Sequence, residues 1–265
     1  MEDNKSRIYI SSEVKEFYEF IQIAEEKGYG IEIQGFAMPE IMYGDWMKEM
    51  ISYKERLDGF SNGVAFHNPF ISTVTVSDDY KLVENTRNKM RYGFMVAKEL
   101  GATHIVAHFF WWPYYRGDFF DGYIDGQLKF WDEFINFAEK EGITIVMENT
   151  TEPNPDYILP IVEKVNSSKF QINLDIGHTN VFSEIPIVDW IPALKDYIKY
   201  IHFHNNDGSC DQHRWNEKGT IDYEPIFKKL SDLDLHPIIT TEIYKNSELL
   251  NALDFLDTMK EKYNL

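Results

Sequence analysis

The sequence predicts one α/β domain, a (β/α)8 TIM barrel that spans residues 1–265. The first observation is that short apolar runs alternate eight times with stretches of helical periodicity. The second is that four of these runs stop on an ionisable residue, in ITIVMENT, FQINLDIGH, YIKYIHFHN and PIITTEIY. The length also suits a single barrel. An open doubly wound sheet would require a glycine-rich phosphate turn after an early strand, and the sequence has none.

The strand candidates are the short apolar runs, and helical patterns separate them. The candidates are Arg7–Ser11, Gly30–Gln34, Gly63–Asn68, Thr103–Phe109, Ile143–Asn149, Gln171–Ile176, Lys199–Asn205 and Pro237–Ile243. VKEFYEFIQIAEEKGYG repeats apolar residues every three or four positions and ends in glycine, as helices often do. DDYKLVENTRNKMRYGFMVAKELGA opens on a capping aspartate and closes in the same way. The remaining helix candidates are QLKFWDEFINFAEKEG, PDYILPIVEKVN, DWIPALKDYI, YEPIFKKLSDLD and SELLNALDFLDTMKEKY.

Ionisable residues stand where the strands end, and in such barrels the active site lies at the carboxyl ends of the strands. A lone histidine or aspartate at a strand end is usually structural. Four together in an apolar interior would be costly without a cation. We therefore predict that one divalent ion is bound, with positions left open for substrate, by Glu148, Asp175, His202 and Glu242.

Further candidate ligands surround these four residues. His67 and His108 end two earlier strands, and His178 follows Asp175 by three residues. Asp211 and His213 form an Asp-x-His pair, which places both side chains on one side of an extended segment. As a set, these residues are able to hold two more cations beside the first.

The chain resembles the xylose isomerase-like barrel superfamily, in particular the branch that contains endonuclease IV and the sugar isomerases and epimerases. The resemblance is carried by HNPF, AHFF, MENT, LDIGH, IHFHNNDG, DQH and TTEI, between positions 67 and 243. Endonuclease IV uses nine ligands for three zinc ions, and each has a match here. The resemblance implies one ion on His67, His108 and Glu148, a second on Glu148, Asp175, His202 and Glu242, and a third on His178, Asp211 and His213.

The sugar epimerases of the same superfamily use one ion on the middle set of ligands. In them the residues matching Glu148 and Glu242 also move the proton, and the residue matching His178 helps to bind substrate. The resemblance thus implies a cofactor of one to three divalent ions, zinc or manganese.

Composition and charge narrow the choice of partner. The formal net charge is −18, which disfavours nucleic acid because phosphate contacts need basic side chains. No apolar run approaches a membrane span. The single cysteine, Cys210, and the polar N-terminus lead us to expect a cytoplasmic protein with a small-molecule substrate.

An aromatic segment, HFFWWPYYRGDFFDGYIDG, follows the fourth strand. We expect Phe109–Tyr123 to overhang the site, either as a wall against the substrate or as a contact between subunits of a homo-oligomer. Trp112, Trp46, His178 and His204 are the predicted substrate-binding residues.

The favoured function is that of a metal-dependent isomerase or epimerase, in which Glu148 and Glu242 move a proton through an enediolate of a small sugar or polyol-type carbonyl compound. The alternative is a three-metal phosphodiesterase like endonuclease IV, of AP endonuclease family 2. A lyase or dehydratase would share the first proton abstraction, and an inactive sugar-binding module is disfavoured because the ligand set is intact.

Overall fold

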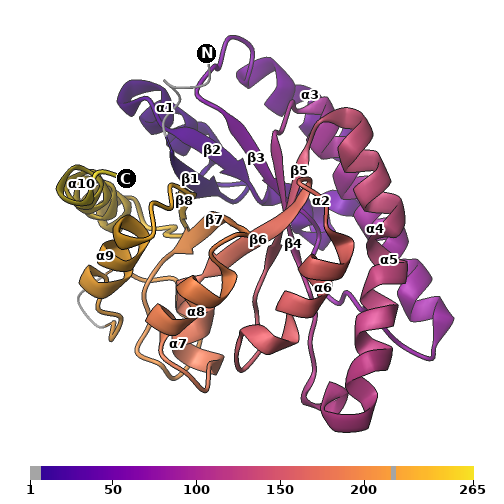
Figure 1. Cartoon of the computed structure of the whole chain (residues 1–265). Helices are drawn as coiled ribbons and strands as arrows, with labels where there is room; N and C mark the ends of the chain where they lie inside the picture. The colour runs from indigo at the N-terminus through magenta and orange to yellow at the C-terminus, as the bar shows by residue number, and fades with distance from the viewer. Residues whose placement is uncertain (1–6, 216–218) are drawn as a thin grey trace.

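In the computed structural model, which describes residues 7–215 and 219–265, eight parallel strands close into a barrel in chain order. The last strand pairs with the first, with Thr241 opposite Ile10. Figure 1 shows the strands at the centre with the helices around them. The strands are β1 (Ile8–Ser12), β2 (Gly30–Ile33), β3 (Val64–His67), β4 (His104–His108), β5 (Thr144–Glu148), β6 (Phe170–Asp175), β7 (Ile198–Phe203) and β8 (Ile238–Thr241). The predicted fold is confirmed, and each strand falls within one or two residues of its predicted bounds.

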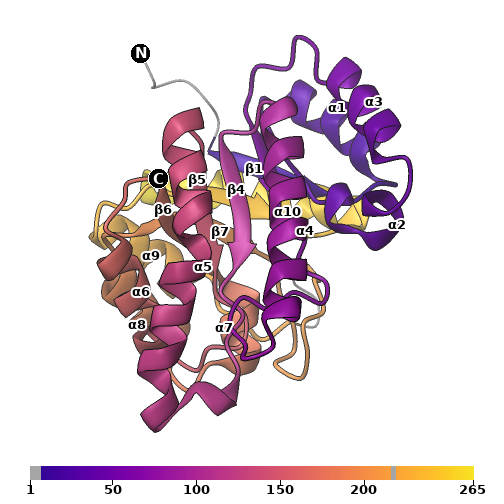
Figure 2. The ribbon, with the colours of Figure 1, turned by 90° about the vertical axis from the view of Figure 1, so that its right-hand side faces the viewer.

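Helices cover the outside of the barrel. The longer ones are α1 (Phe17–Lys27), α3 (Trp46–Arg56), α4 (Tyr80–Glu99), α5 (Phe120–Glu141), α9 (Glu224–Asp232) and α10 (Asn246–Tyr263). The shorter ones are α2 (Pro39–Met42), α6 (Leu159–Val165), α7 (Ile176–Phe182) and α8 (Ile187–Leu194), together with 3-10 turns at Gly35–Ala37, Pro113–Tyr115, Gly117–Phe119 and Pro155–Tyr157. Figure 2 shows α4 and α5 running side by side along one flank. The first and last helices are also neighbours, because Lys27 of α1 forms an ion pair with Asp254 of α10.

Two helical regions differ from the sequence prediction. Helix α5 begins at Phe120, seven residues before the predicted start at Gln127, because Tyr123, Ile124 and Gln127 already occupy its buried face at helical spacing. The sequence pattern predicts no helix between the second and third strands, where the structure has α2 and α3. Helix α3 fully buries one residue, Tyr53, so its apolar pattern is weak.

The core has two parts. Most of the apolar side chains lie between the strands and the surrounding helices. A small cluster, which includes Tyr9, Ala65, Val106 and Tyr200, fills the barrel interior. In the described part of the chain, no helix combines the length and apolar character that a bilayer crossing requires.

Candidate metal centre

The centre of the site is the imidazole of His202, on β7. Its Nδ1 lies 3.2 Å from Glu148 Oε2, 3.2 Å from Glu242 Oε2 and 3.7 Å from Asp175 Oδ2. All four side chains are buried. The strands bring together the four residues that the sequence analysis placed around one divalent ion.

Local structure fixes these side chains at the carboxyl ends of the strands. Asp175 ends β6 and caps α7, because its Oδ1 accepts the backbone N–H of His178 at 2.6 Å. Its backbone N–H donates to the Asn149 side chain, and the Asn149 amide donates back to the Asp175 carbonyl. Glu148 accepts a hydrogen bond from Asn173 at 3.2 Å. Asp175 and Glu148 are therefore held in place by residues of neighbouring segments.

One flank of the site is formed by the predicted pair His67 and His108. Their Nε2 atoms lie 3.4 and 3.6 Å from Glu148 Oε2. His67 also has its Nδ1 3.0 Å from the Asn68 carbonyl, which orients the ring with Nε2 toward Glu148. The ring of Phe70 stacks on His108 with centroids 5.2 Å apart. This flank has the composition and spacing of a separate cation site.

The other flank is built around Asp211, in the loop after β7. Its Oδ2 lies 3.3 Å from His178 Nε2 and 2.7 Å from His213 Nε2. The loop is tied down by paired backbone hydrogen bonds between Asn205 and Arg214. The predicted set of His178, Asp211 and His213 is thus gathered on one side of the central acids.

His204 lies between the centre and this second flank. Its Nε2 is 3.2 Å from Asp175 Oδ1, and its ring stacks on His213 with centroids 4.2 Å apart and planes 3° from parallel. A Cβ on Gly177 would lie 1.9 Å from the His204 ring, so the glycine leaves the room that this imidazole occupies. His204, His213 and Glu242 offer a further group of ligand atoms.

The charges of the central residues depend on one another. Burial raises the pKa of Glu148, but His202 and His108 outweigh it and hold the pKa well below its usual range. Burial also raises the pKa of Asp175, but the neighbouring His178 and His204 outweigh this effect and hold the pKa well below its usual range. For His202, burial lowers the pKa and the carboxylates of Glu242 and Glu148 raise it well above normal. The acids are therefore ionised and the imidazole holds a proton whenever no other cation balances them.

The pKa values of the flanking imidazoles are shifted in different directions. Burial lowers the pKa of His213, but Glu242 and Asp211 raise it to about 9. His178 is raised well above its usual pKa by Asp175 against the same opposing effect of burial. His108, in contrast, has a lowered pKa because burial dominates. A neutral imidazole is the form that binds a metal, so a cation at this site would replace protons.

The donor set fits a divalent ion. Oxygen and imidazole nitrogen donors suit zinc and manganese. Although His202 Nδ1 faces three carboxylates, it forms no hydrogen bond with any residue that the structure describes. The same is true of His108 Nε2 and His204 Nδ1 among the described residues. Buried nitrogens that lie close to acids but form no hydrogen bond with them are what a site for a cation presents.

Two further residues that border the centre, one on β2 and one just after it, are not predicted by the strand-end pattern. Glu32 is fully buried inside the barrel, with its Oε2 3.2 Å from His202 Nε2. Gln34 donates from its Nε2 to Glu242 Oε1, and to Glu32 Oε1 at 3.3 Å. The pattern of alternate polar residues in GIEIQ was the available indication, because it points both side chains into the barrel.

The predicted aromatic residues are spread over the rim and flank. Trp46, at the start of α3, packs edge-on against Tyr92 of α4. Trp112 is 56% exposed and lies beside Phe110. Within the described residues, neither indole has a ring contact with a histidine of the centre. Trp111 is buried against Tyr157, so the aromatic segment is partly core and partly surface.

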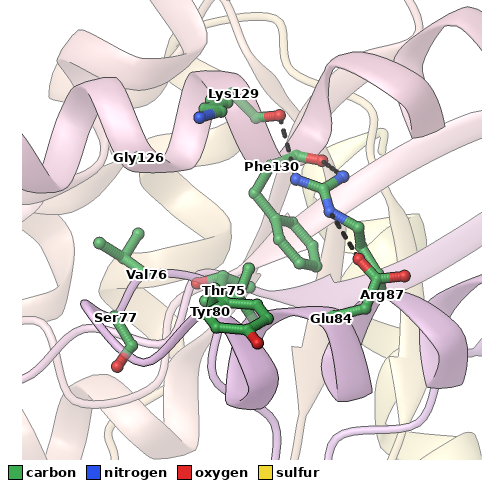
Figure 3. Close-up of a pocket in the computed structure, with 10 residues that line it drawn as sticks. Thr75, Val76, Ser77, Tyr80, Glu84, Arg87, Gly126, Lys129 and Phe130 are labelled. Atoms are coloured by element: carbon green, nitrogen blue, oxygen red, sulfur yellow. Dashed lines mark hydrogen bonds and ion pairs between the residues drawn. The ribbon is translucent and has the colours of Figure 1, made fainter.

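Two cavities lie near this segment. One of about 270 Å³ is lined by Phe110, Trp112, Tyr114 and residues of the β3–α4 loop. The other, of about 400 Å³, lies on the outer flank between α4 and α5 (Figure 3). In the second, Arg87 donates to the carbonyls of Lys129 and Phe130, so its guanidinium is engaged by the protein itself. Neither cavity contains a residue of the candidate metal centre.

The sequence is similar to a known family of barrel proteins. The family model of xylose isomerase-like TIM barrels matches residues 21–259. The uncharacterized protein MJ1311 of Methanocaldococcus jannaschii is 25% identical over 216 residues, 78% of this chain and 72% of that protein.

Solved structures share the fold. A D-tagatose 3-epimerase-like protein has 22% identity and a TM-score of 0.81, with 98% of each chain covered. The TTHB071 protein from Thermus thermophilus, soaked with ZnCl2, has 20% identity and a TM-score of 0.80, covering 97% of this chain and 99% of that one. A D-allulose 3-epimerase from Methylomonas sp. has 17% identity and a TM-score of 0.72, covering 95% and 97%. At these identities the likeness shows the fold.

Proposed function

We propose that this chain, which belongs to the xylose isomerase-like TIM barrel family, is a divalent-metal-dependent epimerase or isomerase of a small polyhydroxy ketone or aldehyde. The observation that carries the proposal is the convergence of Glu148, Asp175 and Glu242 on Nδ1 of His202, which forms no hydrogen bond among the described residues. Structures with the same fold are described as sugar 3-epimerases, which supports this class of substrate.

The chemistry requires polarisation of a carbonyl group and movement of a proton at the neighbouring carbon. A divalent ion held by these four residues supplies the polarisation when bound. Glu148 and Glu242 approach His202 from different strands and are both ionised, so each is able to accept a proton. We assign to one carboxylate the removal of the proton from carbon, and to the other its return on the opposite face, which inverts that centre.

The carboxylate that returns the proton to carbon must itself be protonated before each turnover. His213 Nδ1 lies 3.1 Å from the Glu242 backbone carbonyl and 3.8 Å from Glu242 Oε2, and the pKa of about 9 keeps this imidazole protonated at neutral pH when it holds no metal. We assign to His213 the reprotonation of Glu242, in which its Nδ1 hydrogen moves from the backbone carbonyl to the carboxylate oxygen. His178 and His204 border the same acids and are the proposed substrate-binding histidines, with Trp112 as a rim contact and Trp46 a more distant one.

The proposal is tested by incubating the zinc- or manganese-loaded protein with a panel of ketohexoses and ketopentoses in D2O and following epimer formation and deuterium uptake by NMR. We expect turnover that Glu148→Gln and Glu242→Gln each reduce by roughly 10²–10⁴-fold. Glu55→Gln, on the exposed outer face of α3, is the control.

The same preparations are assayed on a duplex containing an abasic site. Metal-dependent cleavage of that duplex, with no deuterium uptake in any sugar, would contradict the epimerase proposal and support the three-metal phosphodiesterase instead. We expect no cleavage, because a net charge of −18 opposes the phosphate contacts that duplex binding requires.

A further inference from the structure

Beneath His202 lies a second buried acid, Glu32, which none of the proposed chemistry uses. It is fully buried on β2, and its Oε2 lies 3.2 Å from His202 Nε2, the ring nitrogen that does not face Glu148 and Glu242. The hydroxyl of Tyr200 donates to the same oxygen at 2.7 Å. The Tyr200 hydroxyl in turn accepts from Thr240 at 2.6 Å, which directs its own hydrogen toward Glu32.

These contacts determine which ring nitrogen of His202 carries hydrogen. A carboxylate oxygen accepts, so Nε2 must donate to Glu32. The neutral ring then has its lone pair on Nδ1, which is the nitrogen 3.2 Å from both Glu148 and Glu242 and without a hydrogen bond in the described structure. The contact with Glu32 therefore selects the tautomer that offers Nδ1 as a ligand.

A second contact from the end of β2 acts on Glu242. Gln34 donates from its Nε2 to Glu242 Oε1 and to Glu32 Oε1. The hydroxyl of Tyr244 donates to Gln34 Oε1 at 2.8 Å, so the amide cannot turn over without losing that bond. Glu242 Oε2 is left facing His202 Nδ1. The same strand thus orients one imidazole and one carboxylate of the centre.

We propose that Glu32 and Gln34 are positioning residues of the metal centre, which hold His202 in its Nε2–H tautomer and direct one oxygen of Glu242 toward the ion. This inference rests on the proposed function, since it assumes that His202 and Glu242 bind a divalent cation. Partners of this kind that orient a metal-binding histidine typically contribute roughly 10–100-fold in metal affinity.

The test measures zinc affinity by competition with a chromophoric chelator, together with the ¹⁵N chemical shifts of His202 in the zinc-loaded protein and in the metal-free protein at a pH high enough to leave its ring neutral. We expect Glu32→Gln to weaken zinc binding roughly 10-fold or more, and to reduce the share of the Nε2–H tautomer. Glu152→Gln is the matched control, because Glu152 is also a buried glutamate but accepts its hydrogen bond from the Thr150 amide instead of a ligand residue.

The outcomes separate this inference from the proposed function. If the wild-type protein binds no zinc or manganese, the metal centre itself is wrong. If the wild type binds zinc and Glu32→Gln binds it equally well with the same tautomer, the positioning role is overturned and the centre stands. If Glu32→Gln does not fold, Tyr200→Phe decides: a several-fold weaker affinity supports the role, and an unchanged affinity overturns it.

Discussion

At the scale of single residues, the balance between burial and neighbouring charge sets each group's role. The acids of the proposed metal centre are buried, yet neighbouring imidazoles keep them ionised. Glu152 is buried without such a neighbour close enough to prevail, and burial raises its pKa to about 7. One of its oxygens accepts from the Thr150 amide at 2.6 Å, and the other has no hydrogen-bond partner among the described residues. This carboxyl is therefore a source of pH-dependent stability.

We predict that Glu152→Gln flattens the pH dependence of stability. The pKa of Glu152 in the folded protein lies above its unfolded value of 4.5, so the folded state binds the additional proton. Its contribution is complete below pH 4.5 and is lost as the pH rises through 7. Relative to wild type, the variant should gain up to about 3 kcal/mol between about pH 4.5 and 8. Urea unfolding across this range is the measurement, and parallel curves for the two proteins would contradict it.

At the scale of elements, the strand ends could be predicted and the loops could not. Histidine or carboxylate stands at the end of six of the eight apolar runs. This is a local pattern, so the proposed ligand positions at the strand ends follow from the rule that barrel strands share one carboxyl end. Glu32 stands in the middle of its strand, where that rule is silent. The stacking of His204 on His213 depends on the path of a loop that local sequence does not specify.

In the aromatic segment between β4 and α5, neighbouring residues of the same type differ in burial. Trp111 is 3% exposed and packs in the core, with Arg116 over its ring. Its neighbour Trp112 is 56% exposed at a cavity on the rim. Adjacent residues of one type therefore have different surroundings, which a run of aromatics in the sequence cannot distinguish.

We predict that replacing Trp111 lowers stability, whereas replacing Trp112 weakens substrate binding. Trp111→Ala should cost about 3–5 kcal/mol of unfolding free energy because a large buried side chain is lost. Trp112→Ala should change stability by no more than about 0.5 kcal/mol and should raise KM. Denaturant unfolding and steady-state kinetics on both variants provide the comparison. An unchanged KM in Trp112→Ala would remove this residue from the substrate site, and equal losses of stability would show that both rings are core.

At the scale of the whole molecule, a closed barrel concentrates its charge in one place. Parallel strands from every part of the chain deliver acids and imidazoles to one end, while buried side chains such as Tyr9, Val106 and Tyr200 fill the interior below them. The outer surface carries the remaining excess of acid, which suits a small uncharged substrate better than a polyanion. The barrel could be predicted from eight alternations of strand and helix, whereas the number of cations depends on how the flanking groups share Glu148, Asp211 and Glu242.

The most direct test of this account is the metal content of the freshly purified protein, measured by elemental analysis and by native mass spectrometry. We predict at least one divalent ion per chain, and a loss of this ion in Asp175→Asn, which should retain the folded barrel. One ion per chain favours the epimerase or isomerase, and three favour phosphoester chemistry. A wild-type protein that contains no divalent ion, and takes up neither zinc nor manganese at micromolar concentration, would contradict the central claim.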